Sequence, residues 1–557
     1  MSQYRRLLLV AIFNAFLLIP IIFYFRFFPI ILNSFITNCL VVSLIITIIL
    51  LFSYGSLLIK RLRDAFFLIP QATIFTFVSM ALPNLRLSFP PLQDPYYYLA
   101  ATMNIADYGS LKPILMWWYP QIDMQLHWPN MNLITTGLSY STNLDLMQIV
   151  RFQEPLLGTL IFLGTFILTR QITKKNNVAF LSALLTSFSS IILFYLSEYH
   201  PQGLVYIFFI LLLFFYIGYH TNTSKKFVFG ILTILVVVVL VLTHHFSSLF
   251  LGILAIAYLF IIYLICNLPF LKNKLIFIVQ DLKKDYSLFG IIAVIMLSYH
   301  LFAYLLFGKG VLNILLGREP LSQLITMGPN VSMFTTLLSS TKWVLLILAL
   351  ISVFYITKTK NKDEFRCAIL LGCLLIAGFI GTFIVFSPTD RMIGFYLPLA
   401  SLFASLTIFK LRDHKFKISR RKLPTILLIS IISTPIIGGF FSAQSPAYYF
   451  HDSKPDTSYW YSNRLPKMDE YKFGGEWSGY YIAKNAIIGT EFDTNTIPFY
   501  FGNHSLAFIK DIDNTHNFNY YLINPSIPYG DKLYDKKYFD HNMSIVYDNE
   551  ELKLYYR

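Results

Sequence analysis

Long uninterrupted apolar stretches are the feature that most constrains this chain. Stretches of about 20 apolar residues, each long enough to cross a bilayer as a helix, recur along the first 440 positions. They lack the period-two alternation of a transmembrane barrel, and in lipid only a helix satisfies its own backbone polar groups. Composition agrees, since 56% of the residues are hydrophobic and 13% are charged. The sequence therefore predicts a polytopic α-helical membrane protein.

We count about 13 transmembrane helices. The first two predict an N-terminal transmembrane hairpin within residues 1–64, and the others a membrane module over residues 65–442 whose first outer loop is 86–130. The predicted spans lie near residues 7–26, 35–57, 65–84, 147–171, 178–197, 203–219, 227–243, 248–267, 287–307, 340–357, 367–387, 392–409 and 423–442.

Basic residues predict the orientation of these spans. Of the 44 Lys and Arg residues, 25 fall at the loops on one side, 8 at the opposite loops and 11 in the tail. The positive-inside rule makes the richer side cytoplasmic, which places the N-terminus inside and the tail outside. The net charge of +15 then reflects topology and contact with anionic membrane lipid, and we expect no nucleic-acid partner. The predicted localisation is the cell membrane.

After residue 442 the composition changes to Tyr, Asn, Asp and Lys, which predicts a soluble extracytoplasmic α/β domain over residues 443–557. We expect a helix at 476–485, strands within 486–492, 505–509 and 520–524, and a hairpin over 544–557. The domain contains no nucleophile triad and no metal-ligand spacing. We expect it to act as a lid or to dock the acceptor.

Ionisable side chains gather in the predicted outer loops. An acidic residue where lipid meets water is expensive to desolvate, so it is a functional candidate by default. Carboxylate, imidazole and guanidinium groups on one face suit acid–base work on a phosphate-bearing substrate. The residues concerned are Asp94, Glu198, His200, His244, His245, Glu319 and Arg391.

Each candidate also has a structural alternative. Asp94 is well placed to cap a helix that begins near Pro95. Glu198 and His200 also suit a tight, hydrated turn, and Arg391 also suits a contact with lipid headgroups.

The histidine and aromatic candidates have interfacial alternatives. His244 and His245 follow a Val-rich span, where polar residues often mark the end of a helix. Tyr97 belongs to an aromatic-rich loop that suits either stacking on sugar faces or an interfacial belt.

Several motifs that mark other classes of protein are missing from the sequence. The chain has no G-x-x-x-x-G-K-[ST], no G-x-G-x-x-G and no G-x-S-x-G, so no motif supports nucleotide-driven pumping or serine hydrolysis. The four cysteines fall inside predicted spans without C-x-x-C spacing, which predicts neither a zinc site nor a disulfide framework.

Two short motifs resemble those of the C-type (GT-C) glycosyltransferases, membrane enzymes that take sugars from polyprenyl carriers. Asp94-Pro95-Tyr96-Tyr97 resembles the acidic-Pro-aromatic signature of the oligosaccharyltransferase catalytic subunit. Glu198-Tyr199-His200 lies in the turn where that family carries an acidic-x-acidic or Asp-x-His motif. The lid-like segments 95–108 and 131–140 also repeat the order of that family's first loop.

The resemblance implies roles for several residues. Asp94 corresponds to the residue that engages metal and acceptor, Arg391 to the arginine that contacts the carrier's diphosphate, and Glu319 to a loop glutamate that supports acceptor and metal. The oligosaccharyltransferase hallmark Trp-Trp-Asp-Tyr-Gly is missing, since residues 475–481 read Gly-Glu-Trp-Ser-Gly-Tyr-Tyr. A branch closer to the protein mannosyltransferases or lipid-modifying enzymes therefore fits about as well.

We therefore expect an integral-membrane glycosyltransferase. It would transfer a sugar or glycan from a polyprenyl-phosphate or diphosphate carrier to a protein, lipid or glycan acceptor on the extracytoplasmic face. Asp94, Glu198 and His200 form the predicted catalytic and metal set, which suits Mg²⁺ or Mn²⁺. The predicted substrate-binding residues are Arg391, Glu319, His244, His245 and Tyr97.

Two other functions remain open at this stage. A lipid-linked glycan flippase or transporter would explain the spans, although we detect no repeated halves of the kind that many transporters show. A polysaccharide polymerase or ligase would differ chiefly in its acceptor.

Overall fold

A computed structural model gives the fold of the 557-residue chain. It describes residues 3–27, 35–86, 98–99, 101–103, 105–106, 109, 129–196, 199–307, 341–359, 361–384, 389–413, 423–443, 477, 480–482, 487–490, 505–508, 520–523, 544–548 and 553–556.

The chain divides into two compact units. The helical unit comprises Met1–Arg86, Glu154–Ser197 and Pro201–Ser453. The second unit comprises Leu87–Gln153, Glu198–His200 and Lys454–Arg557. Helix α8 begins in the second unit and continues into the helical unit.

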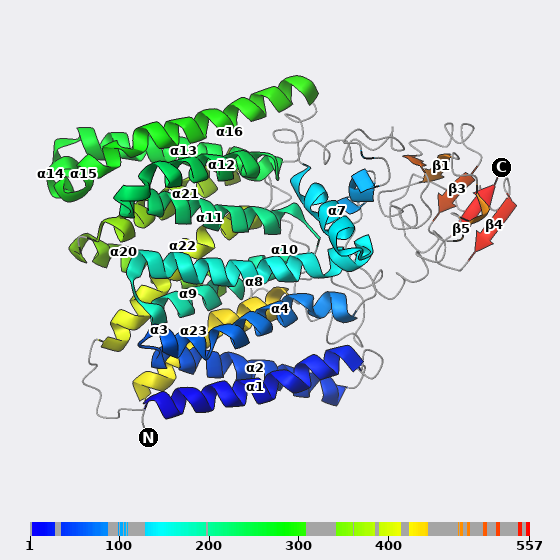
Figure 1. Cartoon of the computed structure of the whole chain (residues 1–557), viewed down its shortest axis with the longest axis horizontal. Coiled ribbons are helices and arrows are strands. Elements are labelled where there is room, and N and C mark those ends of the chain that lie inside the picture. Colours follow the sequence, from blue (N-terminus) through cyan, green and yellow to red (C-terminus); the bar gives the residue numbers. More distant parts are fainter. Residues whose placement is uncertain are drawn as a thin grey trace. The chain divides into compact units, whose positions relative to one another are not determined.

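Most of the described residues are helical, as the apolar stretches predicted (Figure 1). The helices before α11 are α1 (Gln3–Phe27), α2 (Phe35–Leu58), α3 (Leu62–Phe66), α4 (Ile69–Arg86), α7 (Asn130–Thr142), α8 (Leu146–Thr173), α9 (Asn176–Ser187) and α10 (Ser190–Leu196). Those that follow are α11 (Pro201–Thr221), η2 (Thr223–Lys225), α12 (Lys226–Val241), α13 (His245–Asn267), α14 (Pro269–Lys274), α15 (Ile276–Lys283), α16 (Asp285–Phe307), α20 (Thr341–Thr359), α21 (Lys362–Ile384), α22 (Thr389–Asp413) and α23 (Leu423–Ala443).

Several of these helices suit a bilayer. Within the described residues, 7 helical segments are long and apolar enough to cross a membrane, and four shorter apolar helices accompany them. This agrees with a multi-pass membrane protein. The count of about 13 spans and the orientation of the termini stay predictions.

One predicted span is wrong in detail. The stretch near 178–197 was expected to form a single helix, but α9 ends at Ser187 and α10 begins at Ser190. The Ser189 hydroxyl donates to the carbonyl of Thr186 at 2.9 Å. Serine side chains that bond the local backbone compete with the helical ladder, and hydropathy alone does not register this competition.

Helix α22 forms the centre of the helical unit. It packs against α9, α11, α20 and α21, and every residue from Gly394 to Phe409 is buried. The Thr407 hydroxyl donates to the carbonyl of Leu348 in α20 at 2.7 Å. Because α22 begins two residues before Arg391, its packing fixes the backbone of that candidate.

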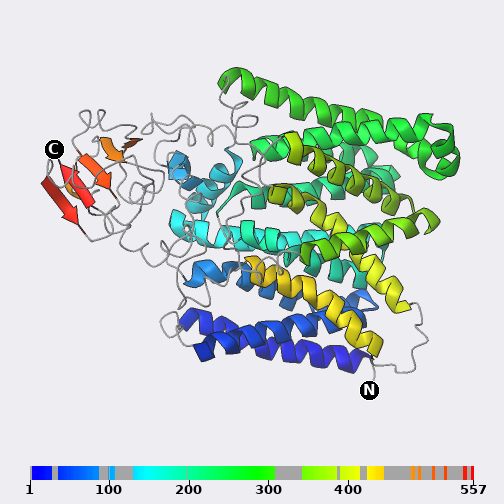
Figure 2. The same cartoon turned by 180° about the vertical axis from the view of Figure 1, so that it is seen from behind.

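The first and last helices of the helical unit, α1 and α23, both pack against α2. Helix α1 packs against α2 and α4, and α23 packs against α2 and α10. In both views α1 and α2 form one side of the bundle and α16, with α14 and α15, forms the opposite side (Figures 1 and 2). The predicted N-terminal hairpin is therefore packed into the bundle.

The second unit contains α7 and a mixed five-stranded sheet. Strands β1 (Ile487–Thr490), β2 (Ser505–Phe508) and β3 (Tyr520–Ile523) pair in parallel, with β1 in the middle. Strand β5 (Lys553–Tyr556) pairs antiparallel with β3 and with β4 (Ser544–Asp548), which gives the order β2-β1-β3-β5-β4. All five strands lie where the sequence predicted them. An independent extracytoplasmic domain over 443–557 stays a prediction.

Candidate active site

Tyr199, the middle residue of the Glu198-Tyr199-His200 motif, joins two segments of the second unit. Its hydroxyl lies 3.0 Å from Oγ1 of Thr102 and 2.7 Å from Oγ1 of Thr135. Its side chain is only 1% exposed. Thr102 belongs to the helical residues after the Asp94 motif, and Thr135 lies in α7. A single tyrosine thus fixes the motif to both lid-like segments predicted from the sequence.

Further polar contacts surround Tyr199. Thr102 donates to Oδ1 of Asn132 at 3.1 Å, and Thr135 donates to Oε1 of Gln153 at 2.7 Å. All four side chains are buried. Because a buried hydroxyl or amide is costly to desolvate without a partner, these hydrogen bonds specify one arrangement of the three segments.

His200 is the described member of the predicted catalytic set. Its side chain is 2% exposed, and Nε2 lies 3.4 Å from the Tyr98 hydroxyl. The two rings meet edge to face, with centroids 5.2 Å apart and an interplanar angle of 73°. Tyr98 lies four residues after Asp94 in the chain. The imidazole therefore contacts the segment that follows the predicted catalytic acid.

The structure describes only part of the other predicted site residues. Asp94, Tyr97, Glu198 and Glu319 lie outside the described residues. Arg391 lies in the first turn of α22 and His245 is the first residue of α13, and only the backbone of each is described. The meeting of Asp94, Glu198 and Arg391 in one pocket stays a prediction.

His244 caps a helix. It is the N-cap residue of α13, and its Nδ1 accepts from the Ser247 N–H at 3.3 Å. The Ser247 hydroxyl in turn donates to Oε1 of Gln202, near the start of α11, at 3.2 Å. His244 thus helps to join the starts of α11 and α13, and its contact with substrate stays a prediction.

Sequence reasoning missed a buried acid, Glu154. It lies in α8 before Pro155 and is fully buried. A Cβ atom built on Gly203 of α11 would lie 2.2 Å from its Oε2 atom, so a larger residue there would force the carboxylate to move. The signal that could have found it is a carboxylate inside an apolar span, which is functional by default.

The start of α22 is held by aromatic rings. Phe395 lies with its ring centroid 5.5 Å from that of Tyr206 and 5.3 Å from that of Phe250. Gly394 brings the backbone against Tyr206, because a Cβ atom there would lie 2.1 Å from Cζ of that ring. These contacts set the position of the α22 turn that carries Arg391.

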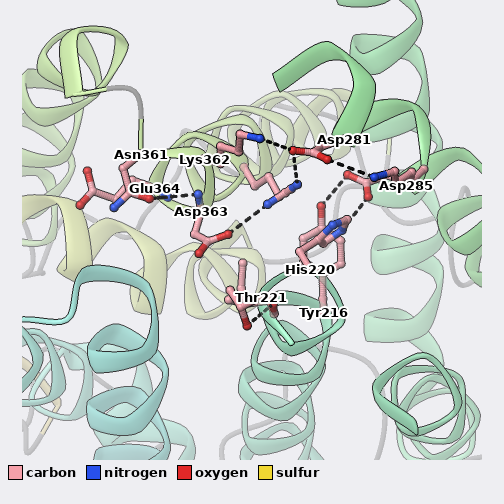
Figure 3. Close-up of polar contacts among 12 residues, drawn as sticks. Tyr216, His220, Thr221, Asp281, Asp285, Asn361, Lys362, Asp363 and Glu364 are labelled. Atoms are coloured by element: carbon pink, nitrogen blue, oxygen red, sulfur yellow. Dashed lines mark hydrogen bonds and ion pairs between the residues drawn. The ribbon is translucent and has the colours of Figure 1, made fainter. Parts of the chain in front are cut away.

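A second buried cluster lies toward the other end of α11 (Figure 3). Oδ2 of Asp285 accepts from the hydroxyls of Tyr216 at 2.8 Å and Tyr258 at 3.0 Å. Its Oδ1 lies 2.7 Å from Nε2 of His220. We call these four residues the Asp285 cluster. It was not predicted, because its members fall inside stretches assigned to spans and their ends.

Two ion pairs, one between α15 and α21 and one within α21, lie beside this cluster in Figure 3. Asp281 pairs with Nζ of Lys362 at 2.7 Å, and Arg366 donates to Asp363 at 3.0 Å. Burial alone would raise the pKa of the Asp281 carboxyl, but hydrogen bonds from Lys362 and Lys284 outweigh it and hold the pKa below its usual value. Each of these carboxylates already has a cationic partner.

No group of three or more His, Cys, Asp or Glu side chains that could hold a metal ion occurs among the residues that the structure describes. Of the predicted ligand set only His200 is described. A buried imidazole suits Mn²⁺ better than Mg²⁺, which prefers oxygen ligands. A divalent ion at this site stays a proposal.

Comparison with known proteins supports the fold. Neither a protein-family profile nor a curated protein sequence matches the chain. The solved structure of the Archaeoglobus fulgidus oligosaccharyltransferase, tethered to an acceptor peptide with an NVT sequon, matches with a TM-score of 0.50 and 11% identity. That match covers 82% of this chain and 69% of the other.

ArnT from Cupriavidus metallidurans matches as well. Its structure with bound undecaprenyl phosphate gives a TM-score of 0.56 at 10% identity and covers 89% of this chain and 98% of that one. The apo structure gives 0.54 at 10% identity, with coverage of 88% and 97%. The chain has the fold of the GT-C glycosyltransferases. The resemblance inferred from two short motifs is thus confirmed at the level of the fold.

Proposed function

We propose that the protein transfers a sugar or glycan from a polyprenyl-phosphate or diphosphate carrier to a protein, lipid or glycan acceptor on the extracytoplasmic face of the membrane. The observation that carries the proposal is the GT-C fold combined with the placement of His200. This residue closes the acidic-x-His motif and contacts the segment that follows Asp94. Two proteins of this fold were solved with an acceptor peptide and with undecaprenyl phosphate, respectively.

The reaction exchanges one bond for another. The bond between the anomeric carbon and the carrier's phosphate oxygen breaks, and a bond from that carbon to the acceptor forms. Asp94 orients the acceptor and accepts its proton. Arg391 neutralises the polyprenyl phosphate as it departs with the electron pair. Asp94, Glu198 and His200 would hold a divalent ion, which would supply further positive charge near the phosphate.

The test is a transfer assay on the purified full chain in lipid nanodiscs. A panel of radiolabelled polyprenyl-phosphate and diphosphate sugars is offered, and both glycosylated product and released polyprenyl phosphate are measured. We expect Asp94→Asn and His200→Ala each to lower the rate by about 10²-fold or more, as for the loss of an acid–base group. Asp413→Asn is the matched control, because Asp413 has a 67% exposed side chain and pairs with Arg412 next to it.

Three outcomes separate the alternatives. Undiminished transfer in the Asp94→Asn variant removes this residue from the mechanism. In sealed vesicles that contain the same protein, movement of labelled donor across the bilayer without release of polyprenyl phosphate supports the flippase alternative. Loss of activity in EDTA that Mn²⁺ or Mg²⁺ restores supports the metal, and full activity in EDTA contradicts it.

A further inference from the structure

The buried acid Glu154 lies on the helix that leads out of the candidate site. A fully buried carboxylate loses several kcal/mol of hydration, so its retention inside a packed bundle requires compensating contacts. Neither the motifs nor the proposed reaction uses this residue.

The position of the carboxylate is defined by Gly203. A Cβ atom on that residue would lie 2.2 Å from Oε2 and 3.3 Å from Cδ of Glu154, and 2.6 Å from Cδ2 of Leu196, so the carboxylate in its present position requires a residue without a side chain at 203. Gly203 is the third residue of α11. The carboxylate therefore lies at the first turn, where the backbone N–H groups lack helical partners and the helix dipole favours negative charge.

Helix α11 begins directly after the motif. His200 precedes Pro201, the first residue of the helix, so any displacement of the first turn moves the backbone of His200 as well. The same turn is held by α13, because Gln202 accepts from the Ser247 hydroxyl at 3.2 Å. Glu154 from α8 and Ser247 from α13 thus contact successive residues of this turn.

We propose that Glu154 is a positioning residue for His200: its carboxylate, seated against the backbone of Gly203, fixes the first turn of α11 and thereby the imidazole. That His200 acts on the substrate rests on the proposed function. The contact itself does not, and the two are tested separately.

The test is a double-variant cycle on the full chain with Gly203→Ala, Glu154→Asp and their combination. Gly203→Ala adds a methyl group where the carboxylate lies, and Glu154→Asp withdraws the carboxylate by one methylene. Gly372→Ala is the matched control, because nothing lies within 4 Å of a Cβ atom at that helical glycine.

The first measurement does not need enzymatic activity. The rate at which diethyl pyrocarbonate modifies His200 is followed by peptide mass spectrometry, with His220 at the far end of α11 as the internal reference. We expect Gly203→Ala to raise the rate by about fivefold, the factor that corresponds to about 1 kcal/mol. The double variant should return most of the way to the wild-type rate, and Gly372→Ala should not change it.

The second measurement is the rate of sugar transfer. We expect Gly203→Ala to lower kcat more than it raises KM for the donor, since the displaced group acts on the reacting atoms. Glu154→Asp in the same chain should restore part of kcat.

The outcomes decide the proposal. Independent effects of the two substitutions, or an unchanged rate of His200 modification in Gly203→Ala, overturn it, because groups in contact are non-additive. If Gly203→Ala does not fold, recovery of a folded chain by Glu154→Asp supports the contact and failure to recover overturns it. If the wild-type chain transfers no sugar, the proposed function fails while the modification cycle still decides the position of His200.

Discussion

Buried polar groups flank α11 at both ends, and the two groups differ in kind. Before the helix, Tyr199 and His200 are held by neutral hydroxyl groups. In its last two turns, Tyr216 and His220 surround the carboxylate of Asp285. A buried carboxylate with several partners joins the helices that carry them, because removing a partner leaves a buried polar group less well compensated. The neutral hydroxyl groups around His200 instead fix the position of its imidazole. We therefore expect the Asp285 cluster to determine stability and the Tyr199 contacts to determine activity.

Asp285→Ala should have the largest effect on stability. It leaves two tyrosine hydroxyls and His220 without their common acceptor, and breaking a buried pair costs about 3–5 kcal/mol. Thermal unfolding in detergent should show a clearly lower midpoint. Transfer activity per folded molecule should stay near the wild-type value.

The control for this variant is Asp413→Ala, whose side chain is 67% exposed. If Asp285→Ala unfolds at the same midpoint as the wild type but transfers no sugar, the assignment of the Asp285 cluster to stability is contradicted. The cluster would then have a role in the reaction.

Tyr199→Phe and Tyr258→Phe form a matched pair that sharpens the comparison. Each removes one buried hydroxyl and leaves its partners unsatisfied, at a cost of about 1–3 kcal/mol in stability. Only Tyr199→Phe should also lower kcat, by about 10- to 100-fold, because small misplacements near reacting groups are expensive. Steady-state transfer kinetics and unfolding are measured on both variants.

Equal effects of the two substitutions on kcat would contradict separate roles for the two regions. A loss of kcat in Tyr258→Phe alone would assign activity to the Asp285 cluster and not to the Tyr199 contacts.

Most of the helices could be predicted from hydropathy alone. Predicted spans such as 147–171 and 423–442 agree with α8 and α23 within a few residues. Hydropathy predicts these helices because the backbone N–H and C=O groups have no water to bond in lipid. A long apolar segment there must form their hydrogen bonds internally, as a helix does. The break at Ser189 was missed because it depends on a local hydroxyl–carbonyl bond, and hydropathy does not encode this.

The site was only partly predictable. His200 was predicted from a motif in a turn that the sequence assigns to the outer face. The structure shows its contact with Tyr98, and its role in the reaction stays a prediction. Tyr199 was expected only as the variable residue of the motif, because the sequence does not reveal which threonines meet it. Glu154 and Asp285 lie within helices, so a search confined to loops passed over both.

Gly394→Ala tests whether the packing of α22 against Tyr206 of α11 also affects binding of the donor. The added methyl would meet Cζ, Oη and Cε1 of Tyr206 at 2.1 to 2.3 Å, so the start of α22 has to move. Since Arg391 lies one turn earlier, we expect KM for the donor to rise about tenfold, the equivalent of about 1.4 kcal/mol. A smaller change in kcat should accompany it.

Tyr206→Leu in the same chain should recover much of the donor affinity by giving the methyl room. Gly372→Ala, at a glycine with open space around it, should leave KM unchanged. An unchanged KM in Gly394→Ala would separate the packing of α22 from donor binding.

The smallest effect should come from pH at the ion pairs beside the Asp285 cluster. Hydrogen bonds from Lys362 and Lys284 hold the pKa of Asp281 below its usual value despite partial burial, which acts the other way. A lowered pKa in the folded protein stabilises it above the unfolded value of about 3.9, and this stabilisation is lost as pH falls through the folded pKa. Lys362→Met should therefore reduce the loss of unfolding free energy that occurs below about pH 4. The reduction should be less than about 1 kcal/mol, because the pair is partly exposed. Transfer activity at neutral pH should not change, and a loss of activity there would show that the far end of α11 influences the site.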